Sequence, residues 1–388
     1  MSAPSIPASR PRRSWRTRAP WRAVSVAALG AAALLLTACG SSAGSSGSSG
    51  STGASSGAGS SGAGPSASSS ADAKETFPLT VKDAAGQTLT FDKPVTDIGC
   101  YWAGCDEILA DLGMVPAASS NIENENGKLV YPDGKPAKDI TKLGGEDNPE
   151  SWAAAGVDLI VVRGPASSAV DAFKTAAKVL YLYAPGFDDA TPYKGLDAYK
   201  QNLRLLGQVT DHVAAANAAI DHFDAFMTAL KSKAPANAAG TTVAMIFQSN
   251  DGTYTLVGPT SPFCVGLVQY GLGKCVSSPS RNATSWQINS EAFLALNPDW
   301  IVYMGGQSGT STSWVKRSDP TWGKLAAVQA KHVYDDPAAR EYCCSLRALA
   351  PSYQLYGYQV WGASSGIGDP GAILDYDYSG QSSPLASH

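Results

Sequence analysis

Two stretches of the sequence decide the fold: NPESWAAAGVDLIVVRG at residues 148–164 and NSEAFLALNPDWIVYMG at residues 289–305. At a constant offset of 141 residues (289 minus 148), an asparagine, a glutamate, an aromatic residue, an aspartate, an isoleucine, a valine and a glycine coincide without a gap. Each copy predicts a short helix that begins at the asparagine, carries the glutamate near its N-terminus and leads through the aspartate into a buried strand. The repeat therefore predicts two lobes built on one plan. A ligand crevice would lie between them, at the carboxyl ends of the strands.

The sequence around the repeat predicts an α/β protein. Apolar residues alternate on both sides of Gly86 over residues 79–91, which indicates an opening hairpin. Helical patterns separate the later strand candidates, and this alternation favours two Rossmann-like lobes with mainly parallel sheets. The strand candidates are residues 95–100, 158–163, 179–183, 242–248, 300–304 and 332–334.

One long helix is predicted between the two halves, over residues 210–233. Its apolar residues follow helical spacing and form one stripe: Val213, Ala216, Ile220, Phe223, Met227 and Leu230. Thr210 is expected to cap its start, Asp211 suits the positive N-terminal end, and Lys231 and Lys233 suit the other end. Pro235 then ends it. About 23 residues of helix span about 34 Å, enough to connect two lobes, although an ordinary amphipathic surface helix would show the same pattern.

The first 38 residues have the form of a secretory signal peptide. Six arginines precede a short uncharged run that extends from Ala23 to Ala38, and the segment contains no acidic residue. Small residues lie directly before Cys39, as in a bacterial lipobox, so Cys39 is the expected lipidation site. The alternative is an ordinary cleavage site that has a cysteine beside it. From Gly40 to about Ser70 the chain is almost entirely Ser, Gly and Ala, which is typical of a flexible tether.

Removal of the leader leaves 23 basic against 33 acidic residues, a net charge near −10. Such an acidic protein is a poor nucleic-acid binder. Six cysteines remain after lipidation, an even number in an oxidising compartment. The preferred pairs are Cys100–Cys105, Cys264–Cys275 and a vicinal Cys343–Cys344. Pairing of Cys343 or Cys344 with Cys100 or Cys105 and a four-thiolate metal site are the alternatives.

The motifs in their order resemble the siderophore- and vitamin B12-binding proteins of ABC importers. They include the opening residues 80–86, the segments 97–98 and 105–113, Leu143-Gly144-Gly145, both repeat copies and a closing helix over residues 347–361. The resemblance covers roughly residues 77–362 and implies two α/β lobes bridged by one long helix. It implies a monomeric, lipid-anchored, extracytoplasmic receptor whose partners are a small solute, an ABC permease and its ATPase.

The resemblance also assigns roles to single residues. Glu150 and Glu291 fall on the positions that dock to the permease in this family; otherwise each simply favours the first turn of its helix. Seven residues are expected in the loops that face the solute: Tyr101, Trp102, Arg163, Trp286, Arg340, Tyr342 and Arg347. Arginines suit anionic chelates and aromatic faces suit a broad ligand. A ferric siderophore is the first expectation for the solute, with cobalamin and haem as alternatives.

The expected domains follow from these features: 1–38 signal peptide, 39–76 lipidated cysteine and tether, 77–209 N-terminal lobe, 210–233 connecting helix, 234–362 C-terminal lobe and 363–388 tail. A direct metal site is not expected, because the four histidines show no ligand spacing. An enzyme is not expected either: residues 362–366 match G-x-S-x-G, but they follow a helix and no acid–base pair accompanies them. A surface hydrolase and a cell-surface interaction protein remain the rivals from other classes.

Overall fold

The computed structural model describes residues 74–120, 123–125, 128–130, 141–142, 148–164, 168–184, 195–248, 254–276, 285–304, 321–336 and 345–368. All of them lie in the second of the two units into which the chain divides, Ala67–His388. The predicted signal peptide, Cys39, the predicted tether, Arg340, Tyr342, Cys343 and Cys344 lie outside the described residues, as does most of the predicted tail. Within the described ranges, no helix is both long enough and apolar enough to span a membrane.

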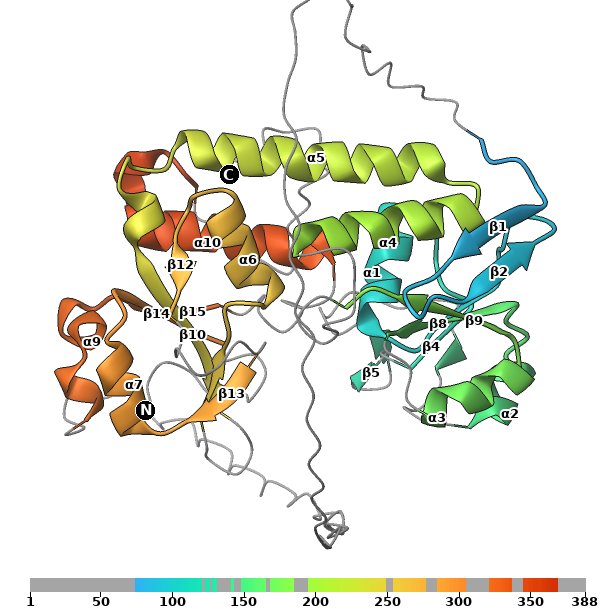
Figure 1. The fold of residues 1–388 in the computed structure, drawn as a ribbon, viewed down its shortest axis with the longest axis horizontal. Helices are drawn as coiled ribbons and strands as arrows, with labels where there is room; N and C mark the ends of the chain where they lie inside the picture. Colours follow the sequence, from blue (N-terminus) through green and yellow to red (C-terminus); the bar gives the residue numbers. More distant parts are fainter. Residues whose placement is uncertain are drawn as a thin grey trace, which may run out of the picture. The chain divides into compact units, whose positions relative to one another are not determined.

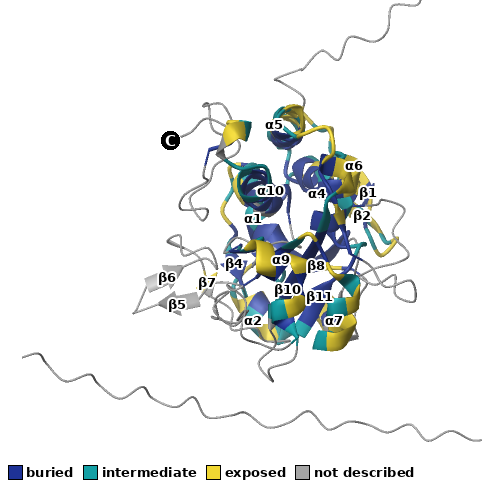
Figure 2. Ribbon diagram, turned by 90° about the vertical axis from the view of Figure 1, so that its left-hand side faces the viewer, coloured by how far each residue is buried: buried dark blue, intermediate teal, exposed yellow. Residues whose placement is uncertain are grey.

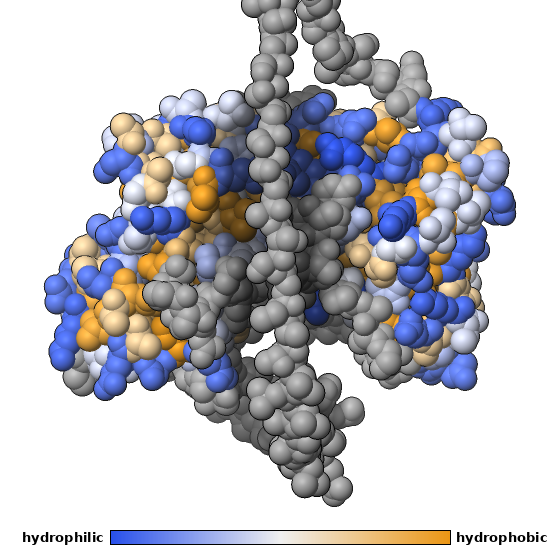
Figure 3. All heavy atoms as spheres, in the orientation of Figure 1, coloured by the Kyte–Doolittle hydropathy of each residue, from blue (hydrophilic) through white to orange (hydrophobic). Residues whose placement is uncertain are grey.

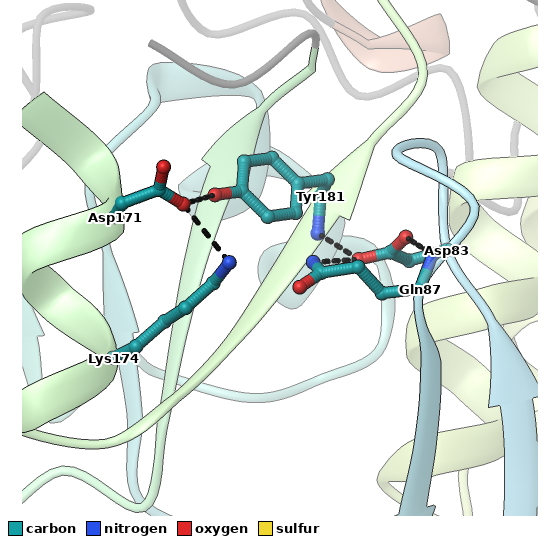
Figure 4. A network of polar contacts seen from close by, with 5 residues as sticks. All are labelled: Asp83, Gln87, Asp171, Lys174 and Tyr181. Atoms are coloured by element: carbon teal, nitrogen blue, oxygen red, sulfur yellow. Dashed lines mark hydrogen bonds and ion pairs between the residues drawn. The ribbon is translucent and has the colours of Figure 1, made fainter. Parts of the chain in front are cut away.

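The folded part opens with the predicted hairpin. Strands β1 (Leu79–Lys82) and β2 (Thr88–Phe91) pair antiparallel, with Leu79 opposite Phe91 (Figure 1). Gly86 adopts a φ of 77° in the turn, a conformation that favours glycine. In the same turn, the Asp83 carboxylate accepts hydrogen bonds from the Gln87 backbone N–H at 2.8 Å, from Gln87 Nε2 at 2.9 Å and from the Tyr181 backbone N–H at 3.1 Å (Figure 4). The hairpin thus covers the open edge of the next sheet.

The sheet of the N-terminal lobe is parallel, as the sequence predicts. Its order is β7 (Thr141–Lys142), β4 (Ala118–Ser119), β3 (Ile98–Cys100), β8 (Leu159–Arg163) and β9 (Lys178–Leu182), and each neighbouring pair runs parallel. Helix α1 (Ala103–Asp111) follows β3, and α2 (Pro149–Ala154) precedes β8. Helix α3 (Ser168–Asp171) follows β8, and α4 (Leu196–Val209) follows β9. A separate antiparallel pair joins β5 (Glu123–Glu125) to β6 (Lys128–Val130).

The sheet of the C-terminal lobe is mixed, in the order β13 (Ser285–Ile288), β11 (Tyr254–Val257), β10 (Thr242–Gln248), β14 (Trp300–Tyr303) and β15 (Val333–Asp335). Strands β10, β14 and β15 run parallel, and β12 (Lys274–Cys275) adds to β10 in the same direction. Strands β11 and β13 are antiparallel and were not among the predicted strands. Helices α6 (Pro262–Gln269), α7 (Ser290–Leu296), α9 (Ala326–Ala330) and α10 (Leu346–Trp361) belong to this half of the chain.

Alternating strand residues divide the hydrophobic core into three clusters. On one face of both sheets, Leu159 and Val161 of β8 and Val243 and Met245 of β10 join a single cluster with α1, α4, α5, α6 and α10, which we call the shared core. The opposite faces form one cluster in each lobe, around Trp152 in the N-terminal lobe and around Phe293 and Trp322 in the C-terminal lobe. The shared core therefore runs from one lobe into the other.

Helix α5 (Val213–Ser232) is the predicted connecting helix, three residues shorter at its start. It follows α4 and leads through the short helix η2 (Ala238–Gly240) into β10. Every residue of the predicted stripe is buried except Val213, which is half-buried, and Ala219 and Phe226 widen the stripe. Figure 2 shows the buried side of α5 turned toward α4 and α10 and its outer side exposed.

The predicted cap of α5 is wrong. Thr210 ends α4 instead, and its hydroxyl donates to the Leu206 carbonyl at 2.7 Å. His212 precedes α5 and provides no side-chain cap. The reason is a tight turn at Asp211, whose φ is 61°, and the Asp211 carboxylate accepts a hydrogen bond from the backbone N–H of Glu75 at 2.8 Å. The threonine–aspartate pair thus serves the turn between two helices rather than the start of the second.

Hydrophilic and hydrophobic residues are interspersed on the described surface that faces the viewer in Figure 3. Among the described residues, only Val115 and Val268 are large hydrophobic side chains that are well exposed. Scattered single apolar residues of this kind are usual on folded proteins and mark no site by themselves.

Candidate functional site

The carboxyl edge of the N-terminal sheet brings together three of the predicted solute contacts. The Tyr101 backbone N–H donates to the Val161 carbonyl at 3.0 Å, which continues the β3–β8 ladder by one residue. Trp102 follows, and Arg163 is the last residue of β8, with its side chain exposed. Because parallel strands end at one edge, Tyr101, Trp102 and Arg163 lie at the position where α/β proteins bind ligands.

The two aromatic residues at this edge have different surroundings. Tyr101 is half-buried, and its ring packs against Phe173, with centroids 4.9 Å apart, and against Trp152 at 6.2 Å. That ring therefore supports the core of the N-terminal lobe. Trp102 is also half-buried, but it precedes the first turn of α1 and packs at the margin of the shared core. Trp102 is the better candidate for contact with a ligand at this edge.

The structure places Trp286 differently from the expectation. It lies within β13, opposite Leu256 of β11, and not in a loop after a strand. Its side chain is 8% exposed and packs in the cluster around Phe293. The antiparallel strands β11 and β13, which the sequence pattern did not indicate, are the reason for this burial. Trp286 is therefore part of the C-terminal core.

Arg347 also has a partner that the sequence did not reveal. It lies in the first turn of α10, and its Nη1 is 2.9 Å from Oδ1 of Asp111, the last residue of α1. The Asp111 side chain is 1% exposed and the Arg347 side chain 24%. One turn earlier on α1, Glu107 accepts a hydrogen bond from the Ser345 hydroxyl. No local pattern could connect Asp111 to Arg347, because they are 236 residues apart.

Acidic residues end the strands on the C-terminal side. Asp335 closes β15, and Asp336 follows it fully buried, with its backbone N–H donating to the Tyr303 carbonyl at 2.8 Å. Burial raises the pKa of the neighbouring Tyr334 hydroxyl well above its ordinary value, and the Asp336 charge raises it further. Sequence reasoning missed these aspartates, since two acids after a short strand look like an exposed turn. The expected contacts Arg340 and Tyr342 lie outside the described residues.

An open hollow on the C-terminal lobe lies away from this region. It is lined by residues at the amino ends of β10 and β14 and by α9: Asn237, Gly240, Thr241, Asp299, Trp300, Ala326, Ala330 and His332. The Trp300 and His332 rings stack, with centroids 4.2 Å apart. The hollow is at the opposite strand ends from Tyr303 and Asp335, so it does not belong to the predicted solute site.

Both repeat copies begin with an asparagine cap and an acidic first turn. The Asn148 side chain caps α2 by accepting from the Glu150 backbone N–H at 3.0 Å, and the Asn289 side chain caps α7 by accepting from the Ala292 N–H at 2.8 Å. Glu150 and Glu291 are both exposed in the first turn. An asparagine cap followed by an acidic first turn satisfies free backbone donors and suits the helix dipole, which explains why the same residues recur.

The repeat also fixes each helix to its sheet. The aromatic residues Trp152 and Phe293 are fully buried beneath α2 and α7. Trp152 packs directly over Gly99 of β3, where a Cβ atom would come within 2.6 Å of the indole ring. The backbone N–H of Asp158 donates to the Asp97 carbonyl at 2.8 Å, and that of Asp299 donates to the Thr242 carbonyl at 3.0 Å. The two exposed glutamates thus occupy equivalent positions on two rigid supports.

The described part of the chain contains two disulfide bonds, and both are among the preferred pairs. Cys100 is joined to Cys105, which ties the end of β3 to α1, and Cys264 is joined to Cys275, which ties α6 to β12. All four cysteines are buried. These bonds use the thiols that a four-thiolate metal site would need, so that alternative is excluded for these residues. Disulfides of this kind are typical of an oxidising compartment.

Comparisons with known proteins agree with this architecture. No curated protein matches the sequence. Among known structures, the triscatecholate siderophore binding protein FeuA from Bacillus subtilis is similar with a TM-score of 0.59 and 19% identity, over 73% of this chain and 99% of that one. Staphylococcus aureus SirA, complexed with staphyloferrin B, is similar with a TM-score of 0.58 and 16% identity, over 73% and 98%. The heme binding protein HmuT is similar with a TM-score of 0.56 and 15% identity, over 75% and 92%.

At these identities the three structures establish the fold. The family itself is identified by the sequence profile of the periplasmic binding proteins, which matches residues 99–339 and so spans both repeat copies and the connecting helix. With two α/β lobes, a shared helical core and this match, the chain belongs to the periplasmic binding protein family.

Proposed function

We propose that this protein is the extracytoplasmic receptor of an ABC importer, and that it binds a ferric siderophore between the carboxyl edges of its two sheets. The observation that carries the proposal is the equivalence of Glu150 and Glu291, two exposed carboxylates in the first turns of asparagine-capped helices of two lobes. A permease built from two similar halves would meet one carboxylate from each lobe. The similar structures include proteins named for siderophore binding, which supports this class of solute.

The chemistry of the N-terminal edge supports an anionic solute. Arg163 offers a guanidinium at the end of β8, and Trp102 offers an aromatic face beside it. Guanidinium groups bind anionic oxygens through charge-assisted hydrogen bonds, and indole rings contact broad ligands. Haem is the second candidate for the solute because HmuT, a heme binding protein, has the same fold. Cobalamin is a further candidate within the same class of large chelates.

Tryptophan fluorescence tests the solute class. The purified oxidised protein is titrated with ferric siderophores of several chelate types, with haem and with cobalamin. One of them should quench the fluorescence saturably at submicromolar concentration. Trp102→Phe should remove most of this quenching, whereas Trp361→Phe, at the far end of α10, should retain it. No response to any member of the panel would contradict the proposed solute class.

Arg163→Ala tests the electrostatic part of the proposal. Loss of a charge-assisted hydrogen bond should weaken binding of the anionic solute roughly 10-fold or more. Arg204→Ala is the matched control, since Arg204 is also exposed but lies on α4, away from the carboxyl edge. Equal affinities of the two variants would mean that Arg163 does not contact the solute.

Uptake measurements test the docking glutamates. Glu150→Ala combined with Glu291→Ala should leave solute binding unchanged and abolish transport into cells, because the receptor no longer engages its permease. Asp92→Ala combined with Asp221→Ala removes the same charge from two other exposed positions and should transport normally. Normal uptake by the double glutamate variant would refute the docking role.

The anchor completes the proposal. Lipidation of Cys39 would hold the receptor at the outer face of the cytoplasmic membrane, and the Ser/Gly-rich residues 40–70 would let the folded part move beside the permease. We propose the domain boundaries given above on the same grounds, with the receptor acting as a monomer. Cys39→Ser should release the protein from the membrane fraction into the soluble extracytoplasmic fraction, which cell fractionation measures.

A further inference from the structure

We propose that Arg347 is a positioning residue that holds the two lobes at a fixed spacing, through a polar latch formed by Glu107, Asp111, Ser345 and Arg347. The latch consists of two contacts between α1 and the start of α10. Arg347 Nη1 lies 2.9 Å from Asp111 Oδ1, and the Ser345 hydroxyl donates to Glu107 Oε2. Glu107 and Asp111 are four residues apart on α1, so both carboxylates lie on one side of that helix and reach one segment of chain.

Helix α1 is fixed to the N-terminal lobe. The Cys100–Cys105 disulfide joins its first turn to the end of β3. In the same turn, the buried Asp106 carboxylate accepts a hydrogen bond from the Ser119 hydroxyl at 3.1 Å, which joins α1 to β4. The two acids of the latch therefore move with the N-terminal sheet.

Helix α10 is fixed to the C-terminal lobe. The Tyr353 hydroxyl is 3.1 Å from the carbonyl oxygens of Pro262 and Phe263 in α6, and the Tyr356 hydroxyl donates to the Leu272 carbonyl at 2.9 Å. Gly266 lets this packing occur, since a Cβ atom there would come within 1.8 Å of the Tyr353 hydroxyl oxygen. The contacts between α1 and α10 are thus contacts between the two lobes.

The charges of the latch are not placed to suit their own helices. Asp111 ends α1, where the helix dipole disfavours an anion, and Arg347 begins α10, where the dipole disfavours a cation. The Asp111 side chain is also almost fully removed from solvent. The ion pair offsets both unfavourable placements and joins α1 to α10.

The latch has a consequence for docking. Glu150 on α2 and Glu291 on α7 can engage a rigid permease together only if the two lobes keep a constant spacing. Helix α5 and the shared core join the lobes, and the latch adds a polar connection between α1 and the start of α10. This consequence rests on the proposed function, whereas the latch itself can be tested on the isolated protein.

The test measures the distance between the two repeat helices. Genetically encoded spin labels replace Ala153 on α2 and Ala295 on α7, both exposed, and leave the disulfides intact. The parent protein should give a narrow distance distribution. Arg347→Met should broaden it, and so should Asp111→Asn combined with Arg347→Met. Lys174→Met breaks an exposed ion pair to Asp171 within the N-terminal lobe and should leave the distribution unchanged.

The double variant separates loss of restraint from loss of folding. Arg347→Met alone removes the Arg347 contact from the buried Asp111 carboxylate and should lower the midpoint of urea unfolding. Adding Asp111→Asn removes that charge and should return the urea midpoint most of the way to the parent value. The distance distribution between the spin labels should stay broad. A parent-like distribution in a folded double variant would overturn the latch. A broad distribution with normal uptake would retain the latch and contradict the docking requirement instead.

Discussion

At the scale of single residues, a buried polar group acts through the partners that it satisfies. Asp83 is 2% exposed and accepts three hydrogen bonds, one of them from the Tyr181 backbone N–H at the open edge of β9 (Figure 4). The Ala84 N–H in turn donates to the Tyr181 carbonyl at 2.9 Å. The hairpin turn thereby pairs a strand edge that would otherwise offer free donors and acceptors to another chain.

Asp83→Ala should lower the free energy of unfolding by about 1–3 kcal/mol, because it leaves a buried backbone donor without its acceptor. Urea unfolding measures this change. Asp92→Ala, an exposed position just after the same hairpin, should change the stability by less than about 0.5 kcal/mol. Equal effects of the two substitutions would mean that the Asp83 contacts contribute little.

Breaking the latch at Arg347 should lower the free energy of unfolding more than Asp83→Ala does. Arg347→Met removes the ion pair to the Asp111 side chain, which is 1% exposed, and breaking a buried pair costs about 3–5 kcal/mol. The partial exposure of Arg347 favours the lower end of that range. The denaturation midpoint should therefore fall more than it does for Asp83→Ala, and the order of the two variants is the check.

At the scale of elements, the sequence predicted the helices and strands whose pattern lies within a short stretch of chain. The repeat copies, the hairpin and α5 were predicted because each carries its own periodicity or cap within about 20 residues. Strands β11 and β13 were missed because they border segments rich in Ser, Asn and Gly, which indicate loops. The pairing of Asp111 with Arg347 and the burial of Trp286 depend on tertiary contacts, to which no short pattern responds.

Four tyrosines, two of them on α10, make the stability of the protein sensitive to alkaline pH. Burial raises the pKa of Tyr353 and of Tyr356 above the ordinary value of 10.0, and burial does the same for Tyr334 and Tyr270. These tyrosines ionise more readily in the unfolded chain than in the folded one. The contribution of these neutral tyrosines to the free energy of unfolding is therefore complete below pH 10 and is lost as the pH rises above it.

The free energy of unfolding should fall with increasing slope above about pH 10. Urea unfolding at a series of pH values, followed by tyrosinate absorbance, measures that slope. Tyr353→Phe removes one buried hydroxyl and should make the slope shallower, even though it also removes the contact with the Pro262 and Phe263 carbonyls. An unchanged slope would show that Tyr353 is not protected from ionisation by the fold.

At the scale of the whole molecule, the shared core decides how the lobes relate to each other. Leu159 and Val161 of one sheet and Val243 and Met245 of the other join the same cluster through α1, α4, α5, α6 and α10. Burial of apolar surface is the main stabilising term in folding, and here neither lobe completes that burial alone. The lobes therefore depend on each other for stability.

The folded part should unfold in one cooperative transition despite its two sheets. Tryptophan fluorescence and far-ultraviolet circular dichroism should give coincident urea curves. Two separated transitions would show that the lobes are independent. Residues 234–362 produced alone should remain unfolded, because they lack the α4 and α5 surfaces on which α6 and α10 pack.

The shared core also limits how such a receptor can evolve. A lobe taken from a relative would bring half of a core whose side chains were selected against a different partner, so grafting one lobe should give an insoluble hybrid. Arg163 is exposed at the end of β8 and is not part of that core, and Trp102 packs only at its margin. New solute preferences are therefore expected to arise by exchange of short segments at the carboxyl edges of the sheets. The helices of the shared core are expected to be inherited together.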